Sequence, residues 1–330
     1  MMNLKTDYMG LQLKNPIVAA SSGLTSSVSL VKKLEEAGVG AVILKSLFEE
    51  QINLEVNNIF KSNELNNEYP GAQDYILTYT KSNSIKNYLN LIKNSKSEVD
   101  IPVIASINCI SNSDWTSFAR DIQNAGADAI ELNIYEFPSM NREVKDNYEH
   151  KYIEILQSVK KNISIPVAVK ISRYFSNIVR MVDMLDANGA DSVTVFNRFW
   201  EPDINLDTLE ISSASVMSSP DDSAPVLRWV GILSGILPTL QIAASTGIHD
   251  GKSVVKMLLA GAQVTQICST LYLNGYSVPE LMLSEIESFM KKWDFNSIED
   301  FRGKLSYADI PSFERYERAQ FMRYFSDRKQ

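Results

Sequence analysis

Two lysines stand at the ends of apolar runs in this chain, where charged side chains are uncommon. Lys45 follows the run AVIL, and Lys170 ends the run PVAVK. A buried lysine needs a carboxylate partner or an anionic ligand, and the sequence alone leaves both alternatives open. Asn133 and Asn197 end two other apolar runs and add amide donors and acceptors. Cations beside amides favour a ligand that is rich in anionic and polar groups.

A second polar set follows the last two apolar runs. The turn Ser245-Thr246-Gly247 precedes a predicted helix near Asp250, and Cys268-Ser269-Thr270 leads directly into another helix. Backbone N–H groups at such turns and helix starts bind phosphate well. The two turns together therefore predict a phosphate site.

These residues must be positioned by the elements between them, and those elements repeat. Four apolar runs open after a proline and four after a glycine, and the two kinds alternate. The separations are 22 (Pro16 to Gly38), 24 (Pro102 to Gly126), 23 (Pro166 to Gly189) and 23 (Pro238 to Gly261). Short apolar runs are typical of parallel strands buried on both faces, and amphipathic helix patterns lie between them. The pattern predicts one (β/α)₈ TIM barrel domain over residues 1–330, with an open doubly wound sheet as the alternative.

Three further segments modify the predicted barrel. Residues 3–14 predict a hairpin that turns at Gly10 and plugs one end. Long connections follow strand 2 (residues 47–80) and strand 6 (residues 198–223). Loops of this length in a compact domain are commonly lids or binding loops. Both leave the C-terminal rim of the barrel, so we expect them to cover the substrate.

Composition excludes several classes of function. The net charge of −8 provides no basic surface for nucleic acid, and no apolar run approaches the roughly 18 residues that would span a membrane. Two cysteines and two histidines offer no metal site; we expect His150 to be solvated and His249 to be a loop residue. Glu131 lies within a strand, where it is expected to face a lysine in a structural or catalytic pair. We expect a soluble, cytoplasmic protein with a small-molecule substrate.

In this order along the chain, the motifs resemble those of the dihydroorotate dehydrogenases, a family of FMN-dependent (β/α)₈ flavoproteins. The matching segments are NPIVAASSG, VILKS, ELN, VAVK, the strand-6 Asn, the strand-7 Ser-Thr-Gly, GAQVTQI and SIEDFRGKL. The resemblance covers nearly the whole chain. It implies oxidation of dihydroorotate to orotate in pyrimidine biosynthesis, or of a related cyclic amide, by hydride transfer to flavin.

The resemblance also implies roles for individual residues. FMN contacts are implied at Ala20, Ser21, Lys45, Ser46, Asn133, Lys170 and Asn197, and phosphate contacts at Gly235, Thr246, Gly247, Cys268 and Ser269. Lys170 is implied to stand beside the N1–C2 carbonyl edge of the flavin, where a cation favours the reduced anion. Asn133 and Asn197 would hold the substrate ring and its carboxylate, with Asn67 as a further substrate contact.

The sequence departs from the family pattern on the substrate side. The family places a Cys or Ser base three residues after the strand-4 asparagine or in a nearby loop, whereas Glu136 occupies that spacing here. Glu136 is either the catalytic base or a solvated loop carboxylate. The loop after strand 2 lacks the family's arginine, and Asn67 lies in a loose match to its asparagine segment.

The departures leave alternatives open. The chain could be a flavin-binding relative without dihydroorotate activity, or a Schiff-base lyase that uses Lys170 as its nucleophile. The resemblance is to the soluble class, because the helical membrane extension of the quinone-linked class is missing. We expect a homodimer. No iron–sulfur or nicotinamide motif is present, so such an electron acceptor would require a partner chain, with fumarate-like direct oxidation as the other route.

Overall fold

The computed structural model describes residues 2–48, 72–108, 115–134, 148–310 and 314–317. Eight parallel strands form its centre: β3 (Ile17–Ala19), β4 (Ala41–Ile43), β6 (Val103–Asn108), β7 (Ala129–Asn133), β8 (Val167–Ile171), β9 (Ser192–Val195), β12 (Gln241–Ser245) and β13 (Val264–Ile267). The order is β4-β3-β13-β12-β9-β8-β7-β6, and pairing of β4 with β6 closes the ring. The (β/α)₈ barrel prediction is confirmed. A short strand, β5 (Leu47–Phe48), extends the sheet beside the end of β6.

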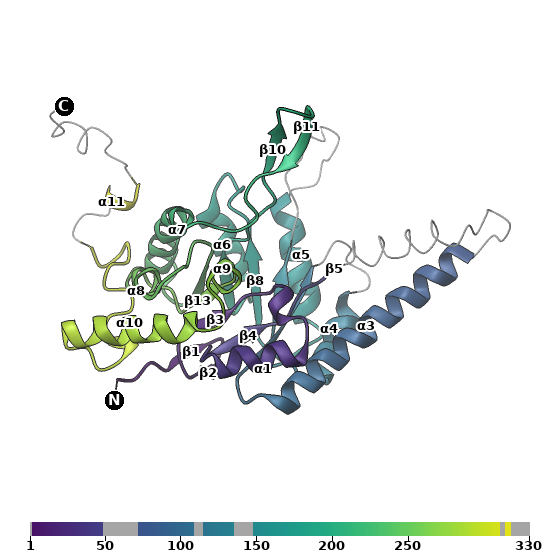
Figure 1. Ribbon diagram of the computed structural model, residues 1–330, viewed down its shortest axis with the longest axis horizontal. Coiled ribbons are helices and arrows are strands. Elements are labelled where there is room, and N and C mark those ends of the chain that lie inside the picture. Colours follow the sequence, from purple (N-terminus) through teal and green to yellow (C-terminus); the bar gives the residue numbers. More distant parts are fainter. Residues whose placement is uncertain (1, 49–71, 109–114, 135–147, 311–313, 318–330) are drawn as a thin grey trace.

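Helices surround the barrel (Figure 1). They are α1 (Val28–Glu36), α3 (Ala72–Glu98), α4 (Trp115–Asn124), α5 (Tyr148–Lys160), α6 (Ile178–Ala187), α7 (Ser223–Ile236), α8 (Gly251–Ala260), α9 (Ser269–Asn274), α10 (Val278–Trp293) and α11 (Glu314–Glu317), with 3₁₀ turns η1 (Gly23–Thr25), η2 (Pro220–Asp222) and η3 (Ile298–Asp300). The four repeat glycines have φ between +88° and +111°, because each lets the chain turn from a helix into the next strand.

The predicted loop over residues 47–80 is wrong at its C-terminal end, because α3 begins at Ala72. After Gly71 the stretch AQDYILTYTK contains neither glycine nor proline, so no residue in it prevents the helix from starting early. The helix runs to Glu98 and extends beyond the barrel wall (Figure 1).

The N-terminal hairpin closes one end of the barrel, as predicted. Strands β1 (Thr6–Tyr8) and β2 (Leu11–Leu13) pair antiparallel around a turn at Gly10, whose φ is +77°. Tyr8 and Leu13 are almost fully buried. They pack in one cluster with strand residues that face the barrel interior, which include Val18, Ile43, Ile104, Ala129, Ala168, Ala243 and Val264. The opposite end, where the strands terminate, is left for a ligand.

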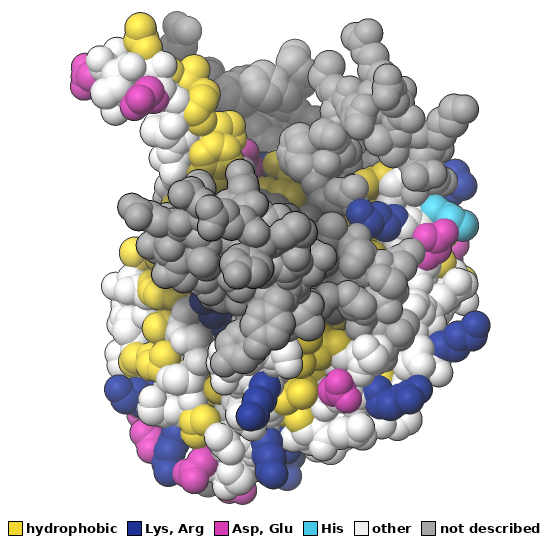
Figure 2. Space-filling view, turned by 90° about the vertical axis from the view of Figure 1, so that its right-hand side faces the viewer, with side chains coloured by type: hydrophobic (Ala, Val, Ile, Leu, Met, Phe, Trp, Pro, Cys, Tyr) yellow, Lys and Arg dark blue, Asp and Glu magenta, His cyan; other side chains and the backbone are white. Residues whose placement is uncertain are grey.

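The connection after β9 contains a second hairpin, β10 (Pro202–Asn205) paired with β11 (Glu210–Ser213). It stands away from the barrel (Figure 1). In Figure 2 it forms the projecting arm, which carries hydrophobic and acidic side chains. Four large aliphatic side chains on it are 58–82% exposed: Ile204, Leu206, Leu209 and Ile211. Within the described ranges, no helix has the length and apolar character needed to cross a membrane.

Candidate active site

A cavity of about 400 Å³ opens where the barrel strands end. Its volume falls in the range of about 300–1,000 Å³ that is usual for small-molecule sites. Eight of the sequence-predicted site residues line it: Ala20, Ser21, Lys170, Asn197, Thr246, Gly247, Cys268 and Ser269. The C-terminal ends of β3, β8, β9, β12 and β13 therefore meet at one cavity, as the barrel predicts.

A buried polar network lies beneath this cavity. Lys170 donates from Nζ to Gln266 Oε1 at 2.8 Å. Gln266 donates in turn to Glu131 Oε2 at 2.6 Å and to Thr194 Oγ1 at 3.2 Å. Thr194 also donates to Glu131 Oε2, at 3.0 Å. Four residues that lie on four different strands are thus connected inside the barrel.

Lys170 and Glu131 form the carboxylate pair that the sequence predicted. Lys170 Nζ lies 3.7 Å from Glu131 Oε1, and both side chains are buried. Glu131 Oε1 accepts no hydrogen bond from the described residues. The pair is long, because a charge-assisted N–H···O bond is typically about 2.7–2.9 Å. The lysine charge is therefore compensated at a distance and not by direct contact.

Cys268 lies close to this charge. Burial raises the pKa of the Cys268 thiol, although the Lys170 ammonium and a hydrogen bond with Ser22 both act to lower it. The thiol is consequently favoured over the thiolate. Cys268 therefore suits a packing and backbone-contact role, and it is poorly suited to be a base.

Serines and asparagines form a second network at the strand ends. Ser46 contacts Ser106 Oγ at 2.6 Å and Ser21 Oγ at 3.0 Å through its own Oγ. Asn133 donates from Nδ2 to Ser46 Oγ at 3.5 Å, and Asn197 donates to Asn133 Oδ1 at 2.6 Å. Ser21, Ser46, Asn133 and Asn197 are thus brought together as predicted. Their mutual hydrogen bonds fix the side-chain amides at the edge of the cavity.

Asn108 adds a further amide at a strand end. It is buried at the end of β6, and neither atom of its amide has a hydrogen-bond partner within the described structure. Because side chains alternate along a strand, Asn108 faces the same side as Ser106, whose hydroxyl group joins the network inside the barrel. A buried amide without a partner costs about 1–3 kcal/mol, which favours a ligand contact there.

The strand-7 turn has left-handed backbone geometry at two successive residues. Thr246 and Gly247 have φ of +85° and +78°. Thr246 Oγ1 donates to the carbonyl of Phe196 at 3.1 Å, which fixes the strained turn. A Cβ at Gly247 would collide with the backbone of Asp222 and Ser223, so only glycine fits.

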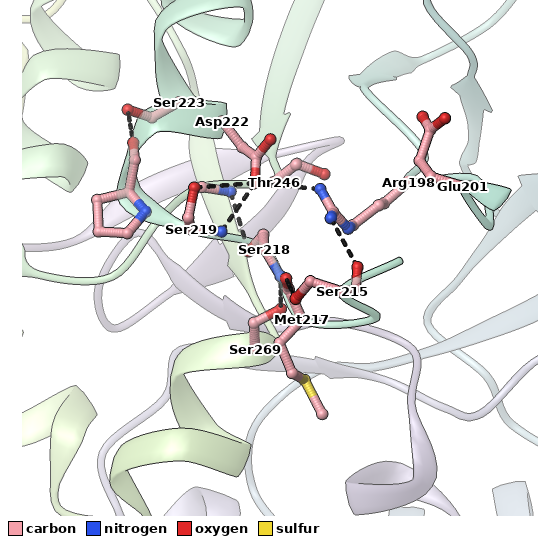
Figure 3. Close-up of polar contacts among 12 residues, drawn as sticks. Arg198, Glu201, Ser215, Met217, Ser218, Ser219, Asp222, Ser223, Thr246 and Ser269 are labelled. Carbon is pink, nitrogen blue, oxygen red and sulfur yellow. Dashed lines mark hydrogen bonds and ion pairs between the residues drawn. The ribbon is translucent and has the colours of Figure 1, made fainter. Parts of the chain in front are cut away.

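Ser218 bridges the two turns of the predicted phosphate site. Its N–H donates to Ser269 Oγ at 2.9 Å (Figure 3), and its hydroxyl accepts from Gly247 N–H at 3.4 Å. The same hydroxyl contacts His249 Nε2 at 3.1 Å. His249 is therefore a loop residue, as expected, but one at the site. No local motif in the sequence predicts Ser218 at this site, because nothing in residues 215–219 indicates that they fold back onto these turns.

Arg198 is a second residue that the sequence analysis did not single out. Its guanidinium donates to Asp222 Oδ2 at 3.1 Å and to the carbonyl of Ser215 at 2.9 Å (Figure 3). Lys170 and Arg198 are the cationic side chains among the described residues that line the cavity. The sequence offers one indication of Arg198, which is its place directly after Asn197 at the end of a barrel strand.

Four of the implied FMN and phosphate contacts are not among the residues that line the cavity: Lys45, Ser46, Asn133 and Gly235. Ser46 and Asn133 are connected to it through Ser21 and Asn197. Lys45 is exposed, whereas its place after an apolar run predicted burial. The physical reason is that β4 ends at Ile43, so the strand alternation no longer directs the side chain inward at Lys45.

Gly235 also lies away from the residues that line the cavity. It lies near the end of α7, where a Cβ would come within 2.7 Å of the backbone nitrogen of Ala308. The close packing of the chain around Tyr307 against the helix is enough to require glycine there. The implied phosphate contact at Gly235 stays a prediction.

The remaining expected residues fall in two groups. Glu136 and Asn67 lie outside the described residues. His150 is exposed on α5, with its Nε2 3.9 Å from Glu154. Within the described ranges, no cluster of three or more His, Cys, Asp or Glu side chains could hold a metal ion.

Comparison with known proteins identifies the family. A family model described as Dihydroorotate dehydrogenase matches residues 3–290. The catalytic subunit of Dihydroorotate dehydrogenase B (NAD(+)) from Methanocaldococcus jannaschii is 24% identical over 296 residues, which are 88% of this chain and 94% of the relative. The protein of the same name from Thermoplasma acidophilum is 27% identical over 309 residues, 92% of this chain and 99% of the relative. Dihydroorotate dehydrogenase A (fumarate) from Limosilactobacillus reuteri is 26% identical over 310 residues, which are 90% of this chain and 96% of the relative. Since the family model covers most of its length and the strand-end motifs meet at one cavity, this chain belongs to the dihydroorotate dehydrogenase family.

Proposed function

We propose that this protein is an FMN-dependent oxidoreductase that acts on a CH–CH bond, oxidising dihydroorotate to orotate or acting on a related cyclic amide. The observation that carries the proposal is the position of Lys170. It is a buried ammonium group at a cavity in a barrel of this family, and it has amide side chains beside it. Such a site suits a ring that acquires negative charge when it is reduced.

The residues present fit FMN. Lys170 and the amides of Asn133 and Asn197 suit the polar edge of a flavin ring, and Ser21 and Ser46 are already linked to them. The turns at Thr246–Gly247 and Cys268–Ser269 would hold the phosphate through backbone N–H groups. Ser218 would contribute there as well, since its hydroxyl and N–H stand between the two turns.

When bound, FMN would supply a hydride acceptor. Lys170 would place positive charge where the reduced ring is negative, and its hydrogen bond to Gln266 restricts its rotation. Asn133, Asn197 and Asn108 would orient the cyclic amide. Burial of these groups keeps the local dielectric low, which strengthens each of these interactions.

We expect one FMN per chain, bound without a covalent link. The bound ligand is released by heat, separated by chromatography and quantified against protein concentration. FMN at about one equivalent per chain supports the proposal. Finding FAD, or finding no flavin after incubation of the protein with FMN, contradicts it.

Anaerobic titration of the flavoprotein with dihydroorotate then tests the substrate. Bleaching of the flavin bands supports dihydroorotate oxidation. A stable flavoprotein that dihydroorotate does not bleach points to the second candidate, a relative that binds flavin and acts on another ring. The observation that favours this second candidate is the missing Cys or Ser at the base position, where the chain has Glu136.

The Schiff-base lyase has less support. A Schiff base requires a lysine amino group that is free to attack a carbonyl. The amino group of Lys170 is instead hydrogen-bonded to Gln266 and paired with Glu131. Borohydride trapping with a carbonyl substrate would detect such an activity.

The projecting hairpin supports our proposal of a homodimer. A two-stranded hairpin that exposes Leu206 and Leu209 at 81% and 82% gains stability when its apolar face is covered. We expect light scattering to give twice the monomer mass of 37.1 kDa. Replacing both leucines with aspartate should give monomers, whereas Leu281→Asp, at a 63% exposed leucine on α10, should not. A monomeric wild type contradicts the proposal.

The electron acceptor is a separate proposal. Relatives named as catalytic subunits of an NAD(+) enzyme and a relative named for fumarate match this chain to similar extents. We propose either an electron-transfer partner chain or direct oxidation by a fumarate-like acid, acting in the cytoplasm. Turnover of the isolated chain with fumarate distinguishes the two routes.

A further inference from the structure

We propose that Gln266 is a positioning residue, which holds the Lys170 ammonium apart from Glu131 and thereby directs its charge toward the bound flavin. The inference rests on the proposed function, because it concerns how the cofactor site is tuned. It assigns to Gln266 a role that differs from simple packing of the barrel interior.

The three side chains come from separate strands that the barrel brings together. Glu131 lies on β7, Lys170 on β8 and Gln266 on β13. On each strand, the residue two positions earlier faces the barrel interior. These residues are Ala129 before Glu131, Ala168 before Lys170 and Val264 before Gln266. Because the side-chain period of a strand is two, all three point into the barrel in the next layer. Gln266 also lines the cavity itself.

Gln266 makes different contacts with its two ends. Its carbonyl oxygen accepts from Lys170 Nζ at 2.8 Å, and its amide nitrogen donates to Glu131 Oε2 at 2.6 Å. The second oxygen of Glu131 has no hydrogen-bond partner within the described structure and is 3.7 Å from Lys170 Nζ. A neutral amide therefore bridges the ammonium group and one carboxylate oxygen, while the other carboxylate oxygen stays 3.7 Å from the ammonium group.

This arrangement leaves part of the lysine's capacity available. An ammonium group has three donors, and the contact to Gln266 uses one of them. If Gln266 were removed, the buried carboxylate oxygen without a partner would attract the ammonium into direct contact, because opposite charges interact strongly at low dielectric. Lys170 would then turn inward, and the cavity would lose both its donors and much of its positive potential.

Sulfite binding measures that potential. Sulfite adds its lone pair to flavin N5, and the electron pair displaced into the ring places negative charge at the N1–C2 edge. A nearby cation therefore tightens sulfite binding. The dissociation constant is read from bleaching of the flavin band and needs no turnover.

We expect Gln266→Met to retain FMN and to weaken sulfite binding by about 10- to 100-fold, the range usual for partners that orient a functional group. Glu131→Gln keeps the shape and the hydrogen bonds but removes the opposing charge, so sulfite binding should tighten. In the Glu131→Gln background, Gln266→Met should weaken sulfite binding much less than it does in the wild type, because no carboxylate remains to attract the lysine.

The control is Gln263→Met, three residues earlier on the chain. Gln263 donates from Nε2 to the carbonyl of Asp7 at 2.8 Å in the hairpin and does not line the cavity. It should leave sulfite affinity unchanged. If wild-type protein binds no FMN, the proposed function fails. If Gln266→Met binds FMN with wild-type sulfite affinity, or if Glu131→Gln weakens sulfite binding, the positioning role is wrong; Glu131→Gln keeps this test decisive even if Gln266→Met does not fold.

Discussion

Replacing Lys170 with methionine should slow the reduction of the bound flavin by dihydroorotate by about 10²- to 10³-fold, the usual cost of losing one group that stabilises transition-state charge. Methionine matches the apolar stem of lysine as far as Cε but has neither charge nor donor. The change also leaves Glu131 buried without a cation. Anaerobic stopped-flow measurement of flavin bleaching gives the rate directly, and the ratio to wild type gives the loss.

Lys160→Met is the matched control. Lys160 lies on α5 and pairs with Asp191 at 2.7 Å, so it is an ion-paired lysine like Lys170, but it is only partly buried and does not line the cavity. The Lys160→Met change should lower the free energy of unfolding slightly and leave the rate of flavin reduction unchanged. The lysine assignment is contradicted if Lys170→Met reduces its flavin at the wild-type rate, or if both variants slow equally.

Much of the barrel could be predicted because its strands are buried on both faces. Such strands form continuous apolar runs, and their spacing repeats with the βα unit, so the eightfold closure follows from the chain itself. The start of α3 was predicted too late because no comparable pattern marks it. The asparagine-rich stretch before Ala72 indicates a loop, but it does not show where the next helix begins.

Lys45 and Lys170 show how finely a site depends on strand ends. Both follow apolar runs of similar length. Lys170 lies within β8, whereas β4 ends two residues before Lys45, and that difference separates a buried cavity residue from an exposed one. Hydrophobic periodicity locates the end of a strand only to within a few residues. A shift of one or two residues is enough to decide whether a side chain at that end is buried or exposed.

The contacts that organise the site are long-range, which is why the sequence did not reveal them. Gln266 bonds to Glu131 from 135 positions away along the chain, and Ser218 bonds to Ser269 from 51 positions away. Neither partner carries a local motif. Types of residue at strand ends predict that a site exists, but only the closed barrel specifies which side chains meet within it.

The base for substrate oxidation is the remaining question, and Glu136 gives the sharpest prediction. Oxidising dihydroorotate requires that a proton leave carbon while hydride leaves to the flavin. Glu136 stands three residues after Asn133, at the spacing where the family has Cys or Ser, and lies outside the described residues. If it is the base, Glu136→Gln should lower the rate of flavin reduction by about 10²- to 10⁴-fold, the usual contribution of general base catalysis. The spectrum of the bound flavin should not change, because the amide keeps the shape of the side chain.

A carboxyl group with the ordinary pKa of about 4.3 is a weak base for a carbon acid, so the opposite result is also informative. If Glu136 is a solvated loop carboxylate, wild-type oxidation of dihydroorotate should be slow and Glu136→Gln should change it little. Glu136→Cys should then raise the rate, because a thiol restores the family's base at the same spacing. Rapid wild-type turnover that Glu136→Gln leaves untouched contradicts both versions, and the base must then be sought at Tyr135, Ser139 or Cys109. Flavin binding separates these results from misfolding, since position 136 is not among the implied cofactor contacts, which should persist in every variant there.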